Sequence, residues 1–391
     1  MTISIRAVEG EERIATSRVL TRYAFEASPR PIDLETERRW PGQGTRRTHV
    51  LFDDDEPRCT ASVIDMTQNV RGVLLPMGAV AGVASHPEAR RGGLARQLVT
   101  YLLADMRDQG QPVSALYPFR ATFYEKFGYL GLGPERQATL KPADLAPLLR
   151  ATVPGEVRLH PYAEAAESVR AITEAVQRDT HGMALRADPG LEKARANEDQ
   201  WAALATVDGE PVGYLAYRIK RYAGELAVWR FLYRDPAART LLLGWLARHV
   251  DQVSAISLPL RPIDRPEHWI TDADIRVESR MSPLHRPAPM ARILSVPGLS
   301  GLGTGPGEIC VRIVDDLIGG VYTFASDGKL SVVDGGTPAA ELTSHGLAAL
   351  VYGVIDPAEL PLRGFGTVSD EAAARLREIF PPAAPFLLES F

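Results

Sequence analysis

The segment Arg90-Arg91-Gly92-Gly93-Leu94-Ala95 combines residue types that can bind a phosphate group. It follows an apolar, strand-like stretch, residues 80–85, and opens a segment in which apolar residues recur every fourth position from Leu94 to Met106. This period predicts a helix that begins near the glycines and ends at Gly110. The first N–H groups of a helix lack internal partners and carry partial positive charge, so they can hold a pyrophosphate.

The spacing of this loop differs from the two common nucleotide-binding patterns. It contains neither GxxxxGK[ST] nor GxGxxG, which leaves a phosphate-bearing cofactor of another kind. Glycine lets phosphates approach the main chain closely, and Arg91 can add charge-assisted hydrogen bonds. Two roles are open for Arg90, a second cationic contact or a solvated residue beside the loop. The competing interpretation of the whole segment is an ordinary tight turn.

Size and composition limit the class of protein. The length of 391 residues exceeds the roughly 250 to 300 residues at which one hydrophobic core stops growing, so we expect two or three domains. Hydrophobic residues make up 45% and charged residues 24%, which is typical of a globular protein with ample core. The net charge of −5 and the absence of basic runs among aromatic residues argue against nucleic acid as a partner.

The cysteines and histidines suggest no metal or disulfide chemistry. Cys59 and Cys310 lie far apart without a CxxC spacing, and the eight histidines are scattered. We therefore expect no bound metal and a reducing, cytoplasmic location. No apolar run reaches the roughly 18 residues of a membrane span and no signal pattern opens the chain, so we expect no membrane association.

The pattern of segments predicts a mixed α/β (α+β) fold in three parts, residues 1–150, 151–287 and 288–391. Strand-like and helix-like segments alternate through the first two thirds of the chain. A proline-containing helical stretch, residues 141–156, predicts the first linker. Residues 282–307 are rich in proline and glycine and predict the second linker.

The first two parts share one order of elements. A strand, a turn and a second strand are predicted both at residues 48–66 and at residues 201–219. Further along, His86–Arg90 aligns with Asp235–Arg239, and each of these segments precedes a predicted amphipathic helix. We interpret this as one fold used twice, with chance recurrence of strand, turn and helix as the alternative. The second copy puts Leu242 where the loop of the first copy has its second glycine, which would bar close approach of a phosphate.

The last part predicts a small sheet with helices. A hairpin turn is expected at Asp327-Gly328 between two strand-like segments. A short helix follows, capped by Thr343 or Ser344 and ending near Gly353. These elements complete a third unit of mixed α/β type.

Two motifs together resemble a known family. The pattern Arg90-x-x-Gly93-x-Ala95, between a strand and a helix, resembles the acetyl-CoA signature of the GNAT acetyltransferases. Residues 112–131, PVSALYPFRATFYEKFGYLG, add a strand, a short helix and an aromatic turn. With the three-part layout, the whole chain resembles the Eis family of aminoglycoside-type N-acetyltransferases. The resemblance implies a GNAT domain that binds acetyl-CoA, a degenerate GNAT-like domain without cofactor, and a sterol-carrier-like domain with a mainly architectural role.

The resemblance also assigns the cofactor contacts. Main-chain groups of the strand before the loop would polarise the thioester carbonyl, and the loop would hold the pyrophosphate. The implied acetyl-CoA contacts are Val83, Ala84, Ser85, Arg90, Arg91, Gly92, Gly93, Leu94, Ala95, Arg96, Phe119 and Arg120. Ser85 replaces a residue that is often aliphatic in relatives, and Phe119 replaces a serine of some members, which removes any hydroxyl contact there.

Acetyl transfer to an amine also needs an acid and a base. Tyr124 matches the family tyrosine that protonates the CoA thiolate, and a phenol with a pKa of about 10 is protonated at neutral pH. From spacing alone, a core tyrosine packed beside Phe123 and Phe127 is the favoured interpretation of Tyr124, and the family match reverses this preference. The resemblance assigns the base to the C-terminal carboxylate, here that of Phe391, and Glu389 is the competing candidate. Prolines and large apolar residues near the C-terminus favour docking of this tail.

The acceptor is the least specified part. Phe25, Glu26 and Trp40 match positions of the family's acceptor pocket, and an acidic, aromatic lining suits a small polycationic amine of aminoglycoside or polyamine type. The alternative is that these three residues pack or face solvent. The expected reaction is direct attack by the amine in a ternary complex.

Two other functions stay open at this point. One is a second enzymatic hypothesis, the acetylation of lysine residues in proteins. The other is a non-enzymatic hypothesis, in which the protein carries a lipid or another small ligand without catalysis. The resemblance further implies a homo-oligomer, commonly a hexamer.

Overall fold

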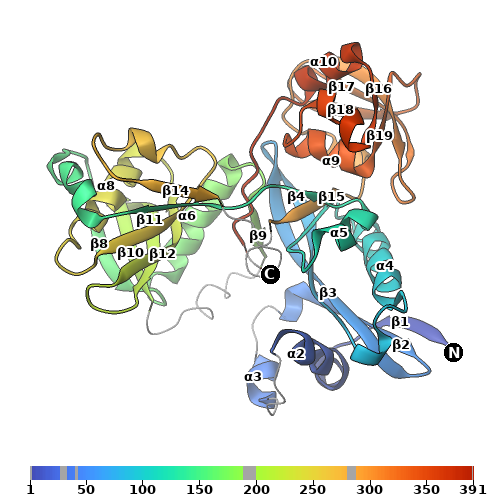
Figure 1. The fold of residues 1–391 in the computed structure, drawn as a ribbon, viewed down its shortest axis with the longest axis horizontal. Coiled ribbons are helices and arrows are strands. Elements are labelled where there is room, and N and C mark those ends of the chain that lie inside the picture. The colour runs from blue at the N-terminus through green and yellow to red at the C-terminus, as the bar shows by residue number, and fades with distance from the viewer. Residues whose placement is uncertain (1, 27–32, 40–42, 188–199, 280–287, 390) are drawn as a thin grey trace. The chain divides into compact units, whose positions relative to one another are not determined.

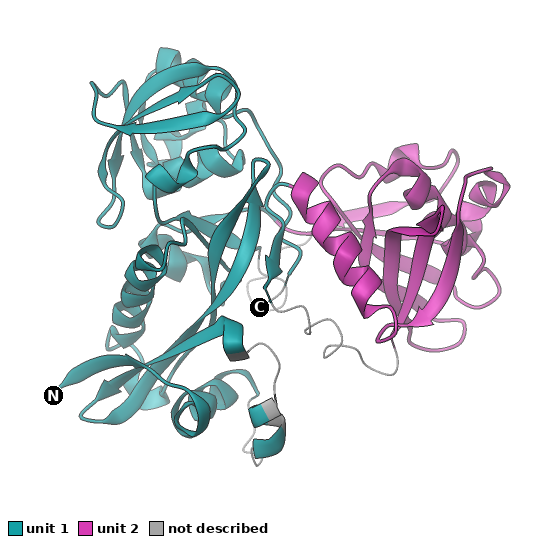
Figure 2. Cartoon of the chain, turned by 180° about the vertical axis from the view of Figure 1, so that it is seen from behind, with its two compact units in different colours: residues 1–133, 181–188, 283–391 teal, residues 134–180, 189–282 magenta. Residues whose placement is uncertain are grey.

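The structure is a computed structural model that describes residues 2–26, 33–39, 43–187, 200–279, 288–389 and 391. These residues form three β-sheets with helices packed on them, which confirms the predicted α/β class (Figure 1). The chain divides into two compact units, each built from separate stretches of sequence (Figure 2). Unit 1 comprises residues 1–133, 181–188 and 283–391, and unit 2 comprises residues 134–180 and 189–282. None of the described helices is long and apolar enough to cross a membrane.

The first sheet of unit 1 has eight strands in the order β1-β2-β3-β4-β5-β15-β6, with β9 paired to β3. Strands β4 and β5 pair in parallel, whereas the other neighbours are antiparallel. The strands are β1 (Ile3–Ala7), β2 (Arg46–Asp53), β3 (Glu56–Val70), β4 (Val73–Ser85), β5 (Val113–Leu116), β6 (Leu130–Gly131), β9 (Ala184–Arg186) and β15 (Met290–Ile293).

Helix α4 (Leu94–Asp108) follows β4 and buries its apolar stripe against the sheet. Leu98, Leu102 and Met106 are fully shielded from solvent, as their four-residue period predicts. The helix starts directly after Gly93 and stops two residues before Gly110, close to both predicted ends. The other helical elements of this region are α1 (Gly10–Arg13), a π-helical turn (Ile14–Arg18), α2 (Val19–Phe25), α3 (Leu34–Arg39) and α5 (Ala121–Tyr124).

The sheet of unit 2 repeats the same pairing scheme. Its seven strands follow the order β8-β10-β11-β12-β13-β7-β14, and β12 and β13 pair in parallel as β4 and β5 do. Helices α6 (Ala166–Asp179) and α8 (Pro236–Ala247) pack on this sheet. The strands are β7 (Arg136–Leu140), β8 (Glu156–Pro161), β10 (Trp201–Val207), β11 (Glu210–Ile219), β12 (Glu225–Tyr233), β13 (Ala255–Leu260) and β14 (Arg276–Ser279).

The two sheets exchange a strand, so the units do not follow the expected boundaries at residues 150 and 287. Strand β7 directly follows β6 of the first sheet in sequence but pairs with β13 of unit 2. Strand β15 follows unit 2 in sequence but pairs with β5 and β6 of unit 1. Each exchanged strand takes the position next to the parallel pair. The compact units are therefore defined by pairing between segments more than 100 residues apart rather than by linkers.

The third sheet belongs to unit 1 and has the order β18-β17-β16-β19-β20. The predicted turn at Gly328, with φ +118°, joins β17 and β18, and the Thr343 side chain, rather than Ser344, caps α9. Arg292 on β15 ties this region to the first sheet through a buried ion pair with Asp315, 2.8 Å long. The elements are β16 (Gly307–Val314), β17 (Gly320–Ser326), β18 (Leu330–Asp334), β19 (Ala340–Thr343), α9 (Ser344–Tyr352), β20 (Gly366–Val368) and α10 (Asp370–Ile379).

Arg71, at the tip of the β3–β4 hairpin, fastens the third sheet's helix and the C-terminal segment to the first sheet. Its guanidinium donates to the carbonyls of Val351 (2.7 Å) and Leu350 (2.8 Å) in the last turn of α9, and to that of Pro381 (2.9 Å). A cation at a helix C-terminus is favourable because the last carbonyls there lack partners. Burial lowers the Arg71 pKa to about 10, so the group stays charged at neutral pH.

His181 and Gly182 hold the next part of the same tail. His181 Nδ1 accepts a hydrogen bond from the Arg71 amide (3.0 Å), and the His181 carbonyl accepts one from the Phe386 amide (2.8 Å). Burial lowers the His181 pKa to about 4, which keeps Nδ1 available as an acceptor at neutral pH. Gly182 has φ +83°, and a Cβ there would lie 2.5 Å from Pro385. The tail is therefore attached along its backbone and not only through side chains.

We expect Arg71→Gln to loosen the C-terminal segment. The variant removes charge-assisted hydrogen bonds to three carbonyls, and we expect a loss of about 3 kcal/mol in the free energy of unfolding. Hydrogen exchange at the Phe386 and Leu387 amides should accelerate. The control is Arg312→Gln, which removes an exposed 4.0 Å pair with Glu341 and should change stability by less than about 1 kcal/mol. Equal exchange rates in both variants would contradict this role of Arg71.

Candidate functional site

A cavity of about 590 Å³ opens in unit 1 where β4 ends and α4 begins. It contains all the residues predicted to contact acetyl-CoA except Gly92 and Arg120. Ala24, Ala89 and Phe123 line it as well, and the sequence did not single them out. Phe123 carried a readable signal, because it lies one helical turn after Phe119 in the aromatic segment. The lining residues are Ala24, Phe25, Val83, Ala84, Ser85, Ala89, Arg90, Arg91, Gly93, Leu94, Ala95, Arg96, Phe119 and Phe123.

The end of β4 is free on one side. Its parallel pairing with β5 stops at Val80, whereas its pairing with β3 continues to Ser85. A bulge between these points contains Gly82, whose φ is +62°. The main chain of residues 83–85 therefore faces the cavity on a strand that β3 still holds in place.

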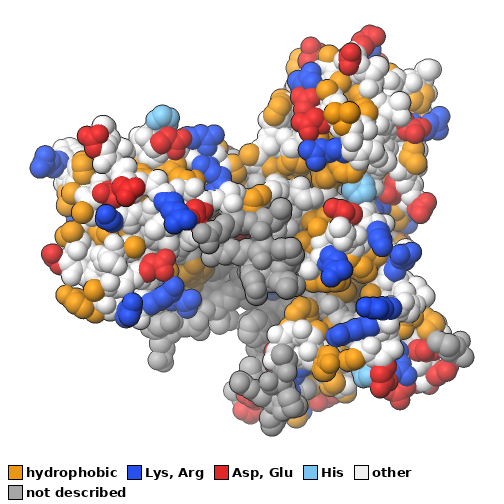
Figure 3. Space-filling model, in the orientation of Figure 1, with side chains coloured by type: hydrophobic (Ala, Val, Ile, Leu, Met, Phe, Trp, Pro, Cys, Tyr) orange, Lys and Arg blue, Asp and Glu red, His pale blue; other side chains and the backbone are white. Residues whose placement is uncertain are grey.

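The loop before α4 has the geometry of an anion site. Gly93 is the N-cap of the helix with φ +83°, and a Cβ built there would have no atom within 4 Å. Because glycine has no side chain, none caps the first N–H groups of α4, and these remain available to a ligand. Arg90 lies over the ring of Tyr23, 5.7 Å from its centroid. Figure 3 shows Lys and Arg side chains gathered over the face of unit 1 around α4.

Tyr124 lies behind the cavity wall rather than in its lining. The side chain is 3% exposed and packs against Phe119 and Phe123, with ring centroids 5.6 and 5.0 Å away. Burial, with smaller contributions from Tyr129 and Cys59, raises the Tyr124 pKa. The phenol is therefore a proton donor throughout the neutral range. Phe119 and Phe123 separate it from the open cavity.

The C-terminal segment docks at the end of β5. The ring of Phe391 packs edge-to-face on Tyr117, with centroids 5.3 Å apart, and the Tyr117 hydroxyl donates to the Leu387 carbonyl at 3.2 Å. Tyr117 precedes the cavity residue Phe119 by two positions. Glu389, the competing candidate base, is 3% exposed. The sequence reasoning missed Tyr117, whose only signal was its place directly after the predicted strand.

The three residues predicted to line the acceptor pocket differ in their surroundings. Phe25 lines the cavity and is 64% exposed, which leaves its ring available to a ligand. The Glu26 carboxylate is bound to Arg18 (2.6 Å) and to Arg22 (3.3 Å). Trp40 lies outside the described residues.

The corresponding end of unit 2 has no phosphate loop. Helix α8 starts at Pro236, and the Asp235 side chain caps it by accepting from the Ala238 amide at 2.8 Å. Leu242 is buried within this helix. Unit 2 therefore lacks the loop altogether, whereas the sequence predicted a loop in which Leu242 bars the approach of a phosphate. An N-cap carboxylate would also repel a phosphate.

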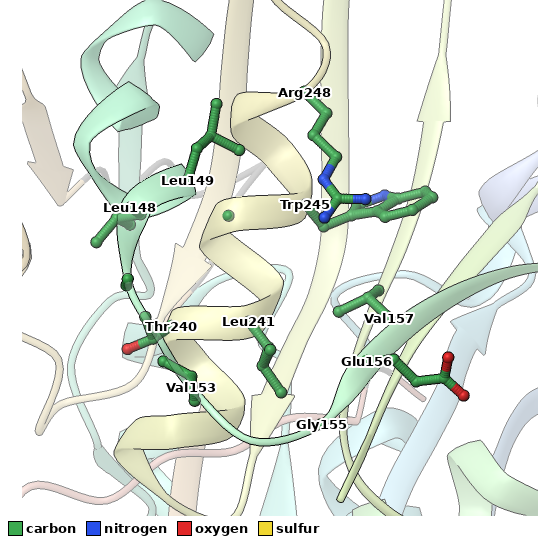
Figure 4. A pocket seen from close by; sticks show the side chains of 12 residues that line it. Leu148, Leu149, Val153, Gly155, Glu156, Val157, Thr240, Leu241, Trp245 and Arg248 are labelled. Carbon is green, nitrogen blue, oxygen red and sulfur yellow. The ribbon is translucent and has the colours of Figure 1, made fainter.

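Unit 2 has a cavity of about 330 Å³ elsewhere, along the outer face of α8. Leu241 and Trp245 of α8, together with Leu148 and Val157, form much of its wall (Figure 4). The Arg248 side chain runs beside the Trp245 indole. This cavity lies along the helix and not at its N-terminus, so it is no counterpart of the site in unit 1.

Comparisons with known proteins agree with this geometry. Residues 4–131 match the model of an acetyltransferase (GNAT) domain, and residues 175–293 match a second acetyltransferase (GNAT) domain model. An uncharacterized N-acetyltransferase of Streptomyces avermitilis is 26% identical over 365 residues, which cover 86% of this chain and 84% of that protein.

Two solved structures share the fold along the whole chain. A GCN5-related N-acetyltransferase from Anabaena variabilis is similar with a TM-score of 0.84 and 20% identity, covering 100% of both chains. Eis1 from Mycobacterium abscessus is similar with a TM-score of 0.79 and 21% identity, also covering 100% of both chains. At these identities the likeness establishes the fold.

The repeated sheet and the matched domain models define a protein with two tandem GNAT-fold domains and a third sheet region. The protein is an acyltransferase enzyme of the GNAT acetyltransferase type. Enzymes of this type use acetyl-CoA as the acetyl donor.

We expect Gly93→Leu to weaken acetyl-CoA binding at least tenfold. The new side chain would enter the space in front of the α4 N-terminus and force a left-handed backbone on leucine. Calorimetry should show the loss of affinity, and thermal stabilisation by acetyl-CoA should disappear.

Gly110→Leu is the matched control for this change. Gly110 lies beyond the other end of α4, has φ +78°, and likewise has no atom within 4 Å of a built Cβ. The substitution should cost similar stability while leaving acetyl-CoA affinity unchanged. Equal affinities in the two variants would exclude the loop as the phosphate site.

Proposed function

We propose that this enzyme transfers the acetyl group of acetyl-CoA to a primary amine of a small molecule, in an Eis-type active site in unit 1. The observation that supports this most directly is the free end of β4 beside the uncapped N-terminus of α4. These two features supply main-chain groups for a thioester and for a pyrophosphate around one cavity. In unit 2 the strand β12 also parts from β13, after Ala227, but the Asp235 side chain caps the N-terminus of α8, so the open helix end is missing there.

Bound acetyl-CoA supplies a thioester that an amine nitrogen can attack with release of the CoA thiol. The chain's part is to orient and to move protons. Residues 83–85 orient the acyl group through their main chain, and the α4 N-terminus with Arg91 holds the phosphates. The positive φ of Gly93 and the empty space at its Cβ position are compatible with a phosphate bound close to the main chain here.

Tyr124 is the proposed general acid. Its raised pKa keeps the proton on the phenol throughout the neutral range, so the proton is in place when the thiolate departs. Phe119 and Phe123 lie between Tyr124 and the open cavity, so this role requires that the thiolate reach the inner end of the cavity.

The proposed base is the α-carboxylate of Phe391. Contact with Tyr117 and the attachments at Leu387 and Phe386 support a fixed position for this group near the cavity. An α-carboxylate has a pKa of about 3.5, so it acts best by binding the ammonium or by relaying its proton through water. Glu389 is the competing base.

The remaining parts of the proposal follow from the family resemblance. A polycationic aminoglycoside or polyamine is the acceptor it implies, and protein lysine is the competing acceptor. The third sheet with α9 and α10 is proposed to be the sterol-carrier-like domain, with an architectural role. A homohexamer is the implied assembly, which light scattering after size exclusion tests.

The decisive experiment moves the carboxylate without removing the tail. One glycine added after Phe391 shifts the carboxylate by about 3.5 Å. We expect kcat to fall at least tenfold with acetyl-CoA affinity unchanged. Phe391→Leu keeps the carboxylate in place and is the control, with a smaller loss. If the extended enzyme turns over at the native rate, the carboxylate is not the base.

We expect Tyr124→Phe to lower kcat by about 10²-fold or more, because a positioned acid contributes that much to catalysis. Acetyl-CoA affinity should persist. Tyr129→Phe is the control, since it removes another buried phenol, one that is hydrogen-bonded to Ser114 at 2.7 Å. Similar kcat values for the two variants, measured with the thermal midpoint of each, would remove Tyr124 from the mechanism.

A further inference from the structure

Arg46 lies directly beside the bulge of β4. One of its guanidinium nitrogens is 3.0 Å from the position a Cβ would take on Gly82, and Thr21 of α2 is 3.7 Å from the same point. Gly82 immediately precedes Val83, which lines the cavity. The positive charge of Arg46 therefore lies beside the residue that precedes the strand segment proposed to hold the acyl group. A side chain on residue 82 would displace it.

The neighbouring carboxylates are already bound by other arginines. Glu26 pairs with Arg18 (2.6 Å) and with Arg22 (3.3 Å). Glu37 pairs with Arg18 and with Arg13, the latter at 3.4 Å. Each carboxylate thus has two guanidinium partners. We call these five residues, together with Arg46, the arginine cluster.

Arg46 is the member of the cluster left over. Within the described part of the chain its guanidinium forms no hydrogen bond and no ion pair, although its main chain pairs with Ile64 of β3. Burial, followed by repulsion from Arg13 and Arg18, lowers its pKa, and Glu37 offsets this only in part. A partly desolvated guanidinium without a partner is costly unless an anion binds it. Four guanidinium groups and two carboxylates also leave the cluster positively charged.

This charge pattern disfavours a polycation. A second ammonium group on the acceptor would approach an uncompensated guanidinium, and like charges at close range repel. A carboxylate, in contrast, can accept two parallel hydrogen bonds from a guanidinium. The exposed ring of Phe25 adds an apolar surface for the carbon chain between the two groups.

We infer that the acceptor is a primary amine that also carries a carboxylate, an amino acid or a close derivative, and that Arg46 binds this carboxylate. The inference rests on the proposed function. In the reaction the neutral amine nitrogen forms a bond to the acetyl carbon and the carbon–sulfur bond of the thioester breaks. The ammonium first gives one proton to the base. As the amide forms, its nitrogen loses a second proton, and the thiolate sulfur takes a proton from the acid. The second proton then restores the acid through solvent, so that one proton in all is released.

The test compares acceptors that differ only in charge. The native-length enzyme is assayed for CoA thiol release with 6-aminohexanoate, its neutral amide 6-aminohexanamide, free amino acids and their amides, spermidine and kanamycin. We expect kcat/KM for the acids to exceed that for the matched amides at least tenfold, and spermidine and kanamycin to be the poorest acceptors. Mass spectrometry of the products confirms N-acetylation.

Variants then assign the preference to Arg46. We expect Arg46→Gln to abolish the preference for acid over amide, through a rise in KM for the acid, and Arg46→Lys to retain part of it. Arg38→Gln is the control, because it removes one positive charge from α3 at an exposed residue paired with Glu11. It should leave the preference intact. Acetyl-CoA affinity and the thermal midpoint of each variant report whether it folds.

Each remaining outcome has a definite meaning. If the native enzyme acetylates spermidine or kanamycin better than the acids, the proposed function stands and the inference fails. If Arg46→Gln lowers turnover equally for acids and amides, Arg46 supports the fold or the tail and the inference also fails. If no amine is acetylated although acetyl-CoA binds, the proposed function fails, and the inference falls with it.

Discussion

The parting of β4 from β5 beyond Val80 is the constraint on which the rest of unit 1 depends. A strand end with free main-chain groups normally frays, yet here β3 holds β4 as far as Ser85 while the other side stays open. The bulge at Gly82 makes this possible, since it bends β4 and increases its local twist without ending the strand. The cavity, the start of α4 and the docked tail all take their positions from this one opening in the sheet.

The tail adds a second constraint of a different kind. A chain end is usually mobile because nothing offsets the entropy of ordering it. Here backbone hydrogen bonds at Pro381 and Phe386, together with the Tyr117 contacts, distribute that cost over several attachments. The third sheet lies on the same path, since Arg71 binds both α9 and the tail. The third sheet therefore contributes to the proposed site by helping to hold the C-terminal segment in position.

Local chemistry made much of the site predictable. A glycine loop before a four-residue apolar period indicates a helix N-terminus open to anions, and the structure has a cavity lined by the residues around Gly93 at this point. The strand exchange was not predictable, because β7 and β15 are short and nothing in them specifies a partner more than 100 residues away. The role of Arg71 was not predictable either, because nothing in its hairpin specifies that its partners lie more than 200 residues further along the chain. In unit 2, the sequence alignment places Leu242 opposite Gly93. In the structure, α8 already starts at Pro236, so Leu242 lies inside the helix and not in a loop before it.

Charge is the property that sequence matching handles least well at this site. Glu26 stands where an acidic pocket residue was expected, but a carboxylate attracts a cation only if its charge is not already neutralised, and Arg18 and Arg22 neutralise it. What remains is the guanidinium of Arg46. With the tail carboxylate as the proposed base, the site presents one negative and one positive group. A zwitterionic amine can satisfy both at once, whereas a polycation satisfies the first and is repelled by the second. In the proposed site, the net field, rather than the presence of an acidic residue, would therefore select the amine.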